Sequence, residues 1–245
     1  MEGPPVRLVA EELSKFVGMR VVSVSGNART EKASVRGKEV VSVFNRGKNL
    51  FIAFPDRSVR VHFLMYGSYR INEEKVGRSP SLSLVFEEGV LNFYGCSVQV
   101  LPNSQVKALY DEEIDITSEK WNAGKVLRLS SQMKGEFVCD ILLDQGVFAG
   151  VGNIIKNEGL FAAKLHPLSI VEKMPEEKMK EVISTTREFS DVFYQVLKRG
   201  ESLSLYLKIY GKRKCYECGG RVVKRVTGKR RRISFFCPSC QKLHS

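Results

Sequence analysis

The chain has 245 residues, of which 43% are hydrophobic and 27% charged, so it can bury a core as one large domain or two to three small ones. Its longest apolar runs, such as residues 50–54, are too short to cross a bilayer, and its N-terminus lacks the basic and apolar stretches of a secretory signal. These features argue against a membrane-spanning or secreted protein, and we expect a folded cytosolic one.

The net charge of +12 is unevenly placed along the chain. The last forty residues, 206–245, hold twelve Lys or Arg and one acid, Glu217, whereas the preceding 205 residues hold 27 basic and 26 acidic side chains. A well-mixed solvated surface would not segregate charge in this way. We therefore expect the C-terminal segment to bind a polyanion, although composition alone does not separate DNA from RNA.

The first part of the chain combines one helical pattern with several alternating segments. Apolar residues from Val6 to Val17 recur at helical spacing, and Gly18 is placed to end the helix. Alternation then predicts strands, with Glu88-Gly89 as a hairpin turn, at 20–25, 39–44, 50–54, 59–63, 82–86 and 90–93. Residues 1–105 are therefore predicted to form one helix packed on a mostly antiparallel β-sandwich.

Helical spacing replaces this alternation after about Ser104. Predicted helices lie at 121–129, 138–143, 154–163 and 176–197. Thr117-Ser118-Glu119 and Met174-Pro175-Glu176 are typical of helix starts. We expect a helical domain over residues 106–205 and a separate basic unit over 206–245, so the fold class is α+β with several domains.

The basic unit carries two Cys-x-x-Cys pairs, Cys215/Cys218 and Cys237/Cys240, with eighteen residues between them. Each pair can turn its two sulfurs toward one point, and two pairs complete a tetrahedral thiolate site for Zn²⁺. The alternating segments 221–226 and 231–236 predict a two-stranded hairpin between the pairs. Because so short a unit cannot sustain a core, we expect a structural zinc ion to stabilise it, and four thiolates leave no open position for catalysis.

A more specific signal lies in the middle of the chain, at LLDQGVFAGVGNI in residues 142–154 and EGLF in residues 158–161. This stretch closely resembles the helix–two-turn–helix of the formamidopyrimidine-DNA glycosylase and endonuclease VIII family. The resemblance continues at EGP in residues 2–4, at RGK in residues 46–48, at YGK in residues 210–212 and at Arg232, five residues before Cys237. It covers essentially the whole chain in order and implies the family's DNA-repair fold and a zinc finger at the C-terminus.

Four residues match family positions that contact DNA, and each also has a plainer interpretation. Lys48 matches a groove lysine at the DNA backbone, although a strand lysine is usually a solvated edge residue. Met65 stands where the family places a wedge that fills the gap left by an extruded base, although it could pack in a core. Asn153 matches a phosphate contact or is a helix cap, and Arg232 matches the finger arginine or is one more solvated charge.

The family's catalytic residues lie at the N-terminus. Most members begin with a proline, whose nitrogen is the nucleophile, followed by Glu-Gly-Pro, whose glutamate is the acid and base. Here Glu2-Gly3-Pro4 is kept, and Met1 stands in place of the proline. Since methionine is not normally removed before glutamate, we expect the Met1 primary amine to persist, and a primary amine can form a Schiff base. The resemblance therefore assigns Met1 and Glu2, with Lys48 in the same groove, as the catalytic residues.

The resemblance implies a base-excision-repair DNA glycosylase with associated abasic-site lyase activity. The purine-directed members carry an Asp-Pro-Arg-Arg-Phe-Gly loop, which residues 92–100 lack, so we favour oxidised pyrimidines or hydantoins as substrates. We expect a monomer that binds damaged DNA, preferably double-stranded, without a membrane partner. Its location would be the cytoplasm and nucleoid, or the nucleus of a eukaryote.

Two other classes stay open at this point. Loss of the N-terminal proline could leave a catalytically impaired protein that binds damaged or abasic DNA, which a strand-cleavage assay would distinguish from an enzyme. A zinc-finger RNA-binding or transcription module would explain the basic unit, but it would not explain EGP, the lysine strand or the glycine-asparagine turn.

Overall fold

The computed structural model describes all 245 residues, and the chain divides into two compact units. Met1 and Pro5–Asp111 form the first unit, and Glu2–Pro4 and Glu112–Ser245 form the second. Met1 and Glu2 are therefore consecutive residues that belong to different units. None of the helices has both the length and the apolar character needed to cross a bilayer.

The first unit is built from two antiparallel sheets, with strand orders β1-β6-β7-β5 and β2-β3-β4-β8. Its helices are α1 (Gly3–Leu13, whose first two residues belong to the second unit) and α2 (Asn103–Leu109), with 3₁₀ turns at Ser14–Phe16 and Lys32–Val35. Its strands are β1 (Val21–Ser25), β2 (Ser42–Arg46), β3 (Asn49–Ala53), β4 (Arg57–His62), β5 (Ser68–Ile71), β6 (Leu82–Phe86), β7 (Gly89–Tyr94) and β8 (Ser97–Pro102).

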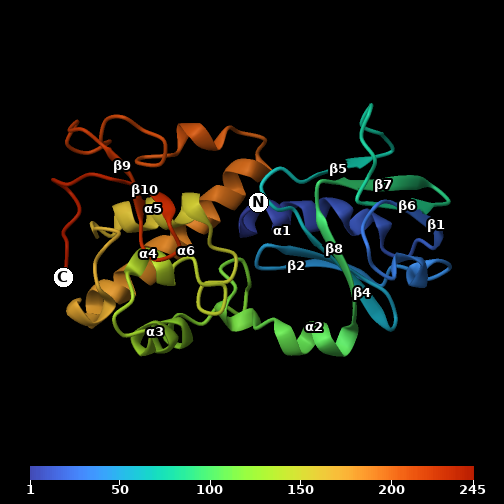
Figure 1. Ribbon diagram of the computed structural model, residues 1–245, viewed down its shortest axis with the longest axis horizontal. Coiled ribbons are helices and arrows are strands. Elements are labelled where there is room, and N and C mark those ends of the chain that lie inside the picture. The colour runs from blue at the N-terminus through green and yellow to red at the C-terminus, as the bar shows by residue number, and fades with distance from the viewer. The chain divides into compact units, whose positions relative to one another are not determined.

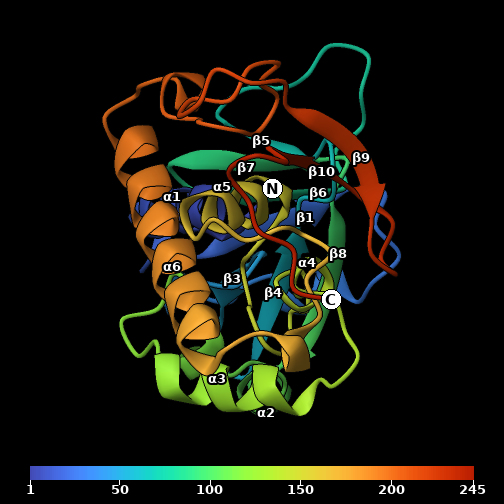
Figure 2. The same ribbon diagram turned by 90° about the vertical axis from the view of Figure 1, so that its left-hand side faces the viewer.

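One apolar core joins α1 to both sheets. Val6 and Leu13 of α1, Val61 of β4 and Phe93 of β7 are all fully buried in it. Alternate residues of each strand point inward, as expected where two sheets share a core. In both views, α1 lies between the strands of the two sheets (Figures 1 and 2). This arrangement confirms the predicted helix on an antiparallel β-sandwich.

The sequence patterns missed three elements of this unit, namely β5, β8 and α2. β5 has only four residues, too few for alternation to be recognised. β8 is held by pairing with β4, from Arg57 opposite Pro102 to His62 opposite Ser97. Residues 97–100 alternate between polar and apolar side chains, but this stretch is short, and its pairing with β4 joins segments far apart in the sequence.

The second unit is helical, with a two-stranded hairpin at its C-terminal end. Its helices are α3 (Ala123–Gln132), α4 (Val138–Ile141), α5 (Asn153–Ala162) and α6 (Glu176–Lys198), its 3₁₀ turns are Glu112–Ile114, Val171–Lys173 and Leu203–Leu205, and its strands are β9 (Val223–Thr227) and β10 (Arg232–Phe236). The predicted helical region and hairpin are confirmed. The helix start predicted at 117–119 is wrong, because the Asn122 side chain accepts a hydrogen bond from Lys125 N (2.9 Å) and caps α3.

The centre of this unit is α5, which packs against α6 and against β10 (Figure 2). Its apolar side chains, such as Ile155 and Leu160, are buried with Val182 and Ile183 of α6. Three consecutive polar residues of α5, 156–158, are also buried, which is unusual for a helix in a protein of this size.

Those three residues hold the C-terminal segment in place. Asn157 Oδ1 accepts a hydrogen bond from Phe235 N of β10 (2.7 Å). The Glu158 carboxylate accepts three backbone N–H bonds, from residues 208, 209 and 210 (2.8–3.0 Å). The Lys156 ammonium donates to Ile233 O (3.1 Å) and to Ser234 Oγ (3.0 Å). Helix α5 therefore holds the C-terminal segment by buried hydrogen bonds, and its Phe161 also packs in the small apolar cluster of that segment.

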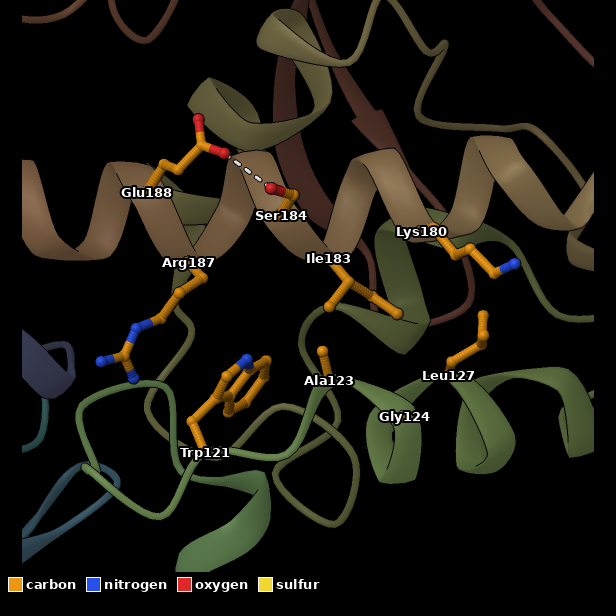
Figure 3. A pocket seen from close by; sticks show the side chains of 9 residues that line it. All are labelled: Trp121, Ala123, Gly124, Leu127, Lys180, Ile183, Ser184, Arg187 and Glu188. Carbon is orange, nitrogen blue, oxygen red and sulfur yellow. Dashed lines mark hydrogen bonds between the residues drawn. The ribbon is translucent and has the colours of Figure 1, made fainter.

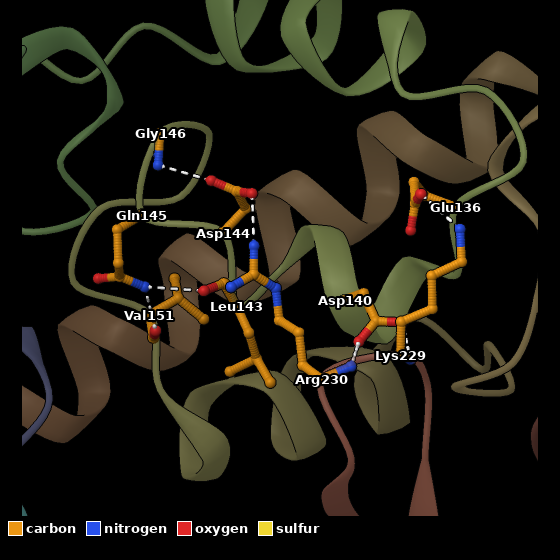
Figure 4. A network of polar contacts seen from close by, with 9 residues as sticks. All are labelled: Glu136, Asp140, Leu143, Asp144, Gln145, Gly146, Val151, Lys229 and Arg230. Atoms are coloured by element: carbon orange, nitrogen blue, oxygen red, sulfur yellow. Dashed lines mark hydrogen bonds and ion pairs between the residues drawn. The ribbon is translucent and has the colours of Figure 1, made fainter.

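The hairpin turn is attached to the helical region by a second set of contacts (Figure 4). The Asp140 carboxylate of α4 accepts the backbone N–H groups of Lys229 (2.7 Å) and Arg230 (2.9 Å). The side chains of the same two residues form ion pairs, Lys229 with Glu136 (2.6 Å) and Arg230 with Asp144 (2.5 Å). Two of the tail's positive charges are therefore neutralised within the protein.

The burial of Lys156 should make the folding stability of the protein depend on pH. Burial lowers its pKa from 10.5 to about 8. Between these pH values the unfolded chain binds more protons than the folded chain, so folding stability rises with pH. Relative to Lys156→Met, which cannot titrate, the unmodified protein should gain up to about 3 kcal/mol of unfolding free energy across that range. Urea unfolding of both proteins at several pH values measures this gain, and a pH-independent difference between them would contradict the buried, titrating lysine.

Candidate active site and nucleic-acid interface

The Met1 amine is held within the first unit by a backbone carbonyl. It donates a hydrogen bond to Leu64 O (2.9 Å), and the Met1 residue is 38% exposed. Leu64 adopts a positive φ of 50°, an uncommon conformation for a branched residue. The amine is therefore both anchored and accessible, which a nucleophile requires.

The loop that holds the amine is itself fixed by His62, at the end of β4. Leu64 N donates a hydrogen bond to His62 Nδ1 (3.1 Å), which requires that nitrogen to be unprotonated. Burial lowers the pKa of His62, and the positive charges of the Met1 amine, Lys48 and Arg60 lower it further. Sequence reasoning did not identify His62, because its role depends on a backbone contact that the sequence does not reveal.

Lys48 lies in the two-residue turn between β2 and β3, directly after Gly47 with its φ of 52°. Its side chain is half-buried, and its charge acts on His62. Lys48 and the Met1 amine thus contribute to the same positive field, which favours a phosphate group nearby.

Met65 lies at the tip of the same loop, between Leu64 and Tyr66, and the three side chains are 71%, 52% and 86% exposed, respectively. An exposure of 71% does not fit the core-packing interpretation of Met65. The loop closes tightly, because Gly67 N donates to Phe63 O (2.7 Å) and a side chain at Gly67 would overlap that carbonyl. The turn presents three consecutive large apolar side chains to solvent, which is consistent with a wedge.

Glu2 belongs to the second unit, where its carboxylate binds the N-terminal end of α5. Oε1 accepts a hydrogen bond from Ile154 N (2.7 Å), and Oε2 accepts from Gly152 N (3.2 Å) and Ile155 N (3.2 Å). A negative charge at a helix N-terminus interacts favourably with its free N–H groups and dipole. A Cβ at Gly152 would lie 2.4 Å from Glu2 Cγ and Cδ, so a larger residue there would displace the Glu2 carboxylate from these N–H groups.

Asn153 is the first residue of α5 and does not cap it. The capping position is Gly152, which has no side chain to accept a hydrogen bond. The Glu2 carboxylate satisfies the free N–H groups of the helix instead. Asn153 Oδ1 is buried without a hydrogen-bond partner in the chain. The plainer interpretation of Asn153 as a cap is therefore wrong, because Gly152 occupies the capping position.

Arg232 opens β10, opposite Thr227 of β9, and is exposed. The buried Lys156 ammonium adds positive charge near it, since Arg232 contributes to the lowered pKa of Lys156. Asn153, Lys156 and Arg232 all belong to α5 or to the strand packed against it. The second unit therefore gathers an amide and two cations around the start of α5.

The four predicted ligands Cys215, Cys218, Cys237 and Cys240 form one cluster, whose sulfurs all lie within 4.8 Å of one another. The Cys215–Cys240 and Cys218–Cys237 sulfur distances are 3.8 and 3.5 Å. A tetrahedral zinc ion with Zn–S bonds of about 2.3 Å needs sulfurs about 3.8 Å apart. The donor set and its spacing therefore fit a structural zinc ion, as in a zinc finger.

The two remaining cysteines are unrelated to this cluster. Burial raises the pKa of Cys96 and of Cys139 to about 11. Both thiols therefore stay protonated at neutral pH and are weak nucleophiles.

An apolar pocket of about 420 Å³ lies between α3 and α6, with Trp121, Leu127 and Ile183 on its walls (Figure 3). Its polar side chains already have partners: Ser184 donates to Glu188 (2.6 Å), and Arg187 donates to two backbone carbonyls. The pocket presents no unsatisfied catalytic group, so we do not include it in the site.

Comparison with known proteins places these features in a family. The family model described as the formamidopyrimidine-DNA glycosylase N-terminal domain matches residues 1–95, and that of the H2TH domain matches residues 103–204. The chain is similar to mouse endonuclease 8-like 3 (34% identical over 237 residues, covering 91% of this chain and 39% of the relative). It is also similar to human endonuclease 8-like 2 (33% identical over 200 residues, covering 76% of this chain and 58% of the relative).

Solved structures show the same fold. A Lactococcus lactis formamidopyrimidine-DNA glycosylase, bound non-covalently to DNA with an abasic site, superposes with a TM-score of 0.86 at 25% identity, covering 99% of this chain and 100% of that one. A viral DNA glycosylase superposes with a TM-score of 0.87 at 21% identity, covering 99% of this chain and 100% of that one. The chain spans about two fifths of the length of the endonuclease 8-like 3 proteins it matches. With two family models matched in order and this fold, the chain belongs to the formamidopyrimidine-DNA glycosylase and endonuclease VIII family.

Proposed function

We propose that the protein is a base-excision-repair DNA glycosylase with abasic-site lyase activity, and that the Met1 amine is its nucleophile. The observation that carries this proposal is the hydrogen bond that holds the amine at Leu64 O, next to the exposed Met65. Family membership supports the reaction class, and the structures of relatives bound to damaged or abasic DNA support DNA as the partner.

The proposed chemistry begins when the neutral Met1 amine attacks the anomeric carbon of the damaged nucleotide. The bond to the base breaks, its electron pair leaves with the base, and the sugar ring opens to an iminium. Loss of the neighbouring C2′ proton then expels the 3′ phosphate. Glu2, the next residue in the chain, is the proposed proton carrier for ring opening, and the carboxylate oxygens that face α5 keep it oriented.

We propose DNA contacts for the four residues that match DNA-contacting positions of the family. Lys48 and Asn153 are proposed to bind phosphates beside the damaged nucleotide, and Arg232 is proposed to bind from the finger. Met65 is proposed to fill the gap that base extrusion leaves, which costs a few kcal/mol of stacking.

For the substrate, we propose oxidised pyrimidines or hydantoins in double-stranded DNA. Residues 92–100, which include the turn from β7 to β8, lack the Asp-Pro-Arg-Arg-Phe-Gly sequence of the purine-directed members. We also propose the three-part division into residues 1–105, 106–205 and 206–245, a monomeric state, and a location at the cell's DNA.

The function is tested by base release from a panel of duplexes that carry single oxidised bases. The unmodified protein should release thymine glycol or hydantoins, whereas Glu2→Gln should lower the rate by about 100-fold or more, because it removes the proton carrier. Glu87→Gln, an exposed carboxylate in the β6–β7 turn, is the matched control and should keep full activity. No release of any oxidised base by the unmodified protein would reject the proposal.

The role of the amine is tested by adding one glycine before Met1. The extension moves the amine away from Leu64 O, so strand cleavage at abasic sites should fall to background while DNA binding persists. Gel assays of cleavage and mobility on one abasic duplex measure both. If the extended protein cleaves at the original rate, Met1 is not the nucleophile.

The metal site is tested by measuring the zinc content and the DNA affinity of two cysteine variants. We propose one structural Zn²⁺ per chain, held by the four cysteines, with a contribution to folding of about 10–16 kcal/mol at the site. Cys218→Ser should lose the zinc and most DNA affinity, whereas Cys96→Ser should keep both. Full zinc content in Cys218→Ser would show that the cluster does not bind the ion as proposed.

A further inference from the structure

The C-terminal segment contains a hollow of about 690 Å³, which we call the finger groove. Five basic side chains line it, and Phe235 of β10 forms an aromatic wall: the basic residues are Lys212, Arg213, Lys214, Arg221 and Lys224. No acidic residue lines the groove. Its shape is fixed by backbone bonds around the first cysteine pair, Cys215 N to Gly220 O (2.8 Å) and Val222 N to Arg213 O (3.0 Å).

The charges in this groove lack the ion pairs that the hairpin turn has. Lys229 and Arg230 of the turn are paired with carboxylates, whereas Arg213, Lys214 and Arg221 form no ion pair in the protein. Lys212 donates only to a backbone carbonyl, at residue 204 (3.1 Å), and Lys224 lies over the Phe235 ring, 5.9 Å from its centre. Like charges gathered without counter-charges repel one another, and a bound polyanion would relieve that repulsion.

The groove is separate from the proposed contact at Arg232. Side chains alternate along a strand, so Arg232 and Ser234 point to one face of the hairpin and Phe235 to the other. Ser234 is fully buried against Lys156, whereas Phe235 pairs across the hairpin with the exposed Lys224. Phe235 and Lys224, which line the groove, therefore lie on the other face of the hairpin from Arg232 and Ser234.

We propose that the finger groove binds the phosphodiester backbone of DNA outside the damaged nucleotide. Several unpaired cations in one hollow suit a chain of phosphates, and an aromatic wall suits a base or sugar next to it. The assignment to DNA rests on the proposed function, which brings this protein to DNA. It adds a second contact that would hold the protein on undamaged flanking sequence.

The experiment compares two triple variants that remove the same charge. The groove variant is Lys214→Gln, Arg221→Gln and Lys224→Gln, and the control is Lys107→Gln, Lys134→Gln and Lys173→Gln, three exposed lysines outside the groove. Dissociation constants for a long undamaged duplex are measured over a range of salt concentrations. Zinc content and thermal melting confirm that each variant is folded.

The groove variant should bind more weakly, and its slope of log affinity against log salt should become shallower by about 0.9 for each phosphate that the variant no longer neutralises. The control should keep the slope of the unmodified protein. Equal slopes in the groove variant and the control would overturn the proposal. So would a groove variant that loses affinity for an RNA strand but not for DNA.

A third readout separates this proposal from the proposed function. Base release from a short damaged duplex, at saturating protein, should be the same in the groove variant and the unmodified protein. If no protein releases a base yet the groove variant still loses salt-dependent DNA affinity, the glycosylase proposal fails and the groove assignment stands.

Discussion

The contact between the Glu2 carboxylate and the N-terminal end of α5 is the interaction on which the second unit depends most. It joins residues about 150 positions apart and satisfies three N–H groups that a helix cannot satisfy by itself. The same helix then holds the C-terminal segment through three consecutive buried side chains, Lys156, Asn157 and Glu158. One helix therefore positions the acidic residue, Asn153 with its unpartnered amide oxygen, and the finger.

Some basic side chains of the C-terminal segment form ion pairs within the protein, and others do not. At the hairpin turn, Lys229 and Arg230 pair with carboxylates and attach the finger to the helical region. Around the first cysteine pair, the cations of the finger groove stay without protein carboxylates. The total charge of the segment therefore overstates what is available to DNA, and the distribution of partners identifies the part that is available.

Periodicity was enough to predict the strands and helices whose apolar face is long, and cysteine spacing was enough to predict the cluster of four sulfurs. β5 has only four residues and gave no such signal, and the alternation in β8 is limited to residues 97–100. The start of α3 was misplaced because Asn122, rather than the earlier Thr-Ser-Glu sequence, makes the capping bond. For the candidate site, residue identity and family resemblance indicated which side chains matter, but not what they contact. Nothing local distinguishes Lys156 from a solvated helix lysine, since its burial is created by β10, nearly eighty residues later.

The proposed chemistry depends on the Met1 amine, held at Leu64 O, attacking the abasic sugar. Borohydride reduction during reaction with an abasic duplex would fix the covalent intermediate, and peptide mass spectrometry would then locate it. We expect a DNA adduct on the N-terminal peptide, at the Met1 nitrogen. An adduct on Lys48, or no adduct under conditions in which the protein cleaves the strand, would contradict the assignment of Met1 as the nucleophile.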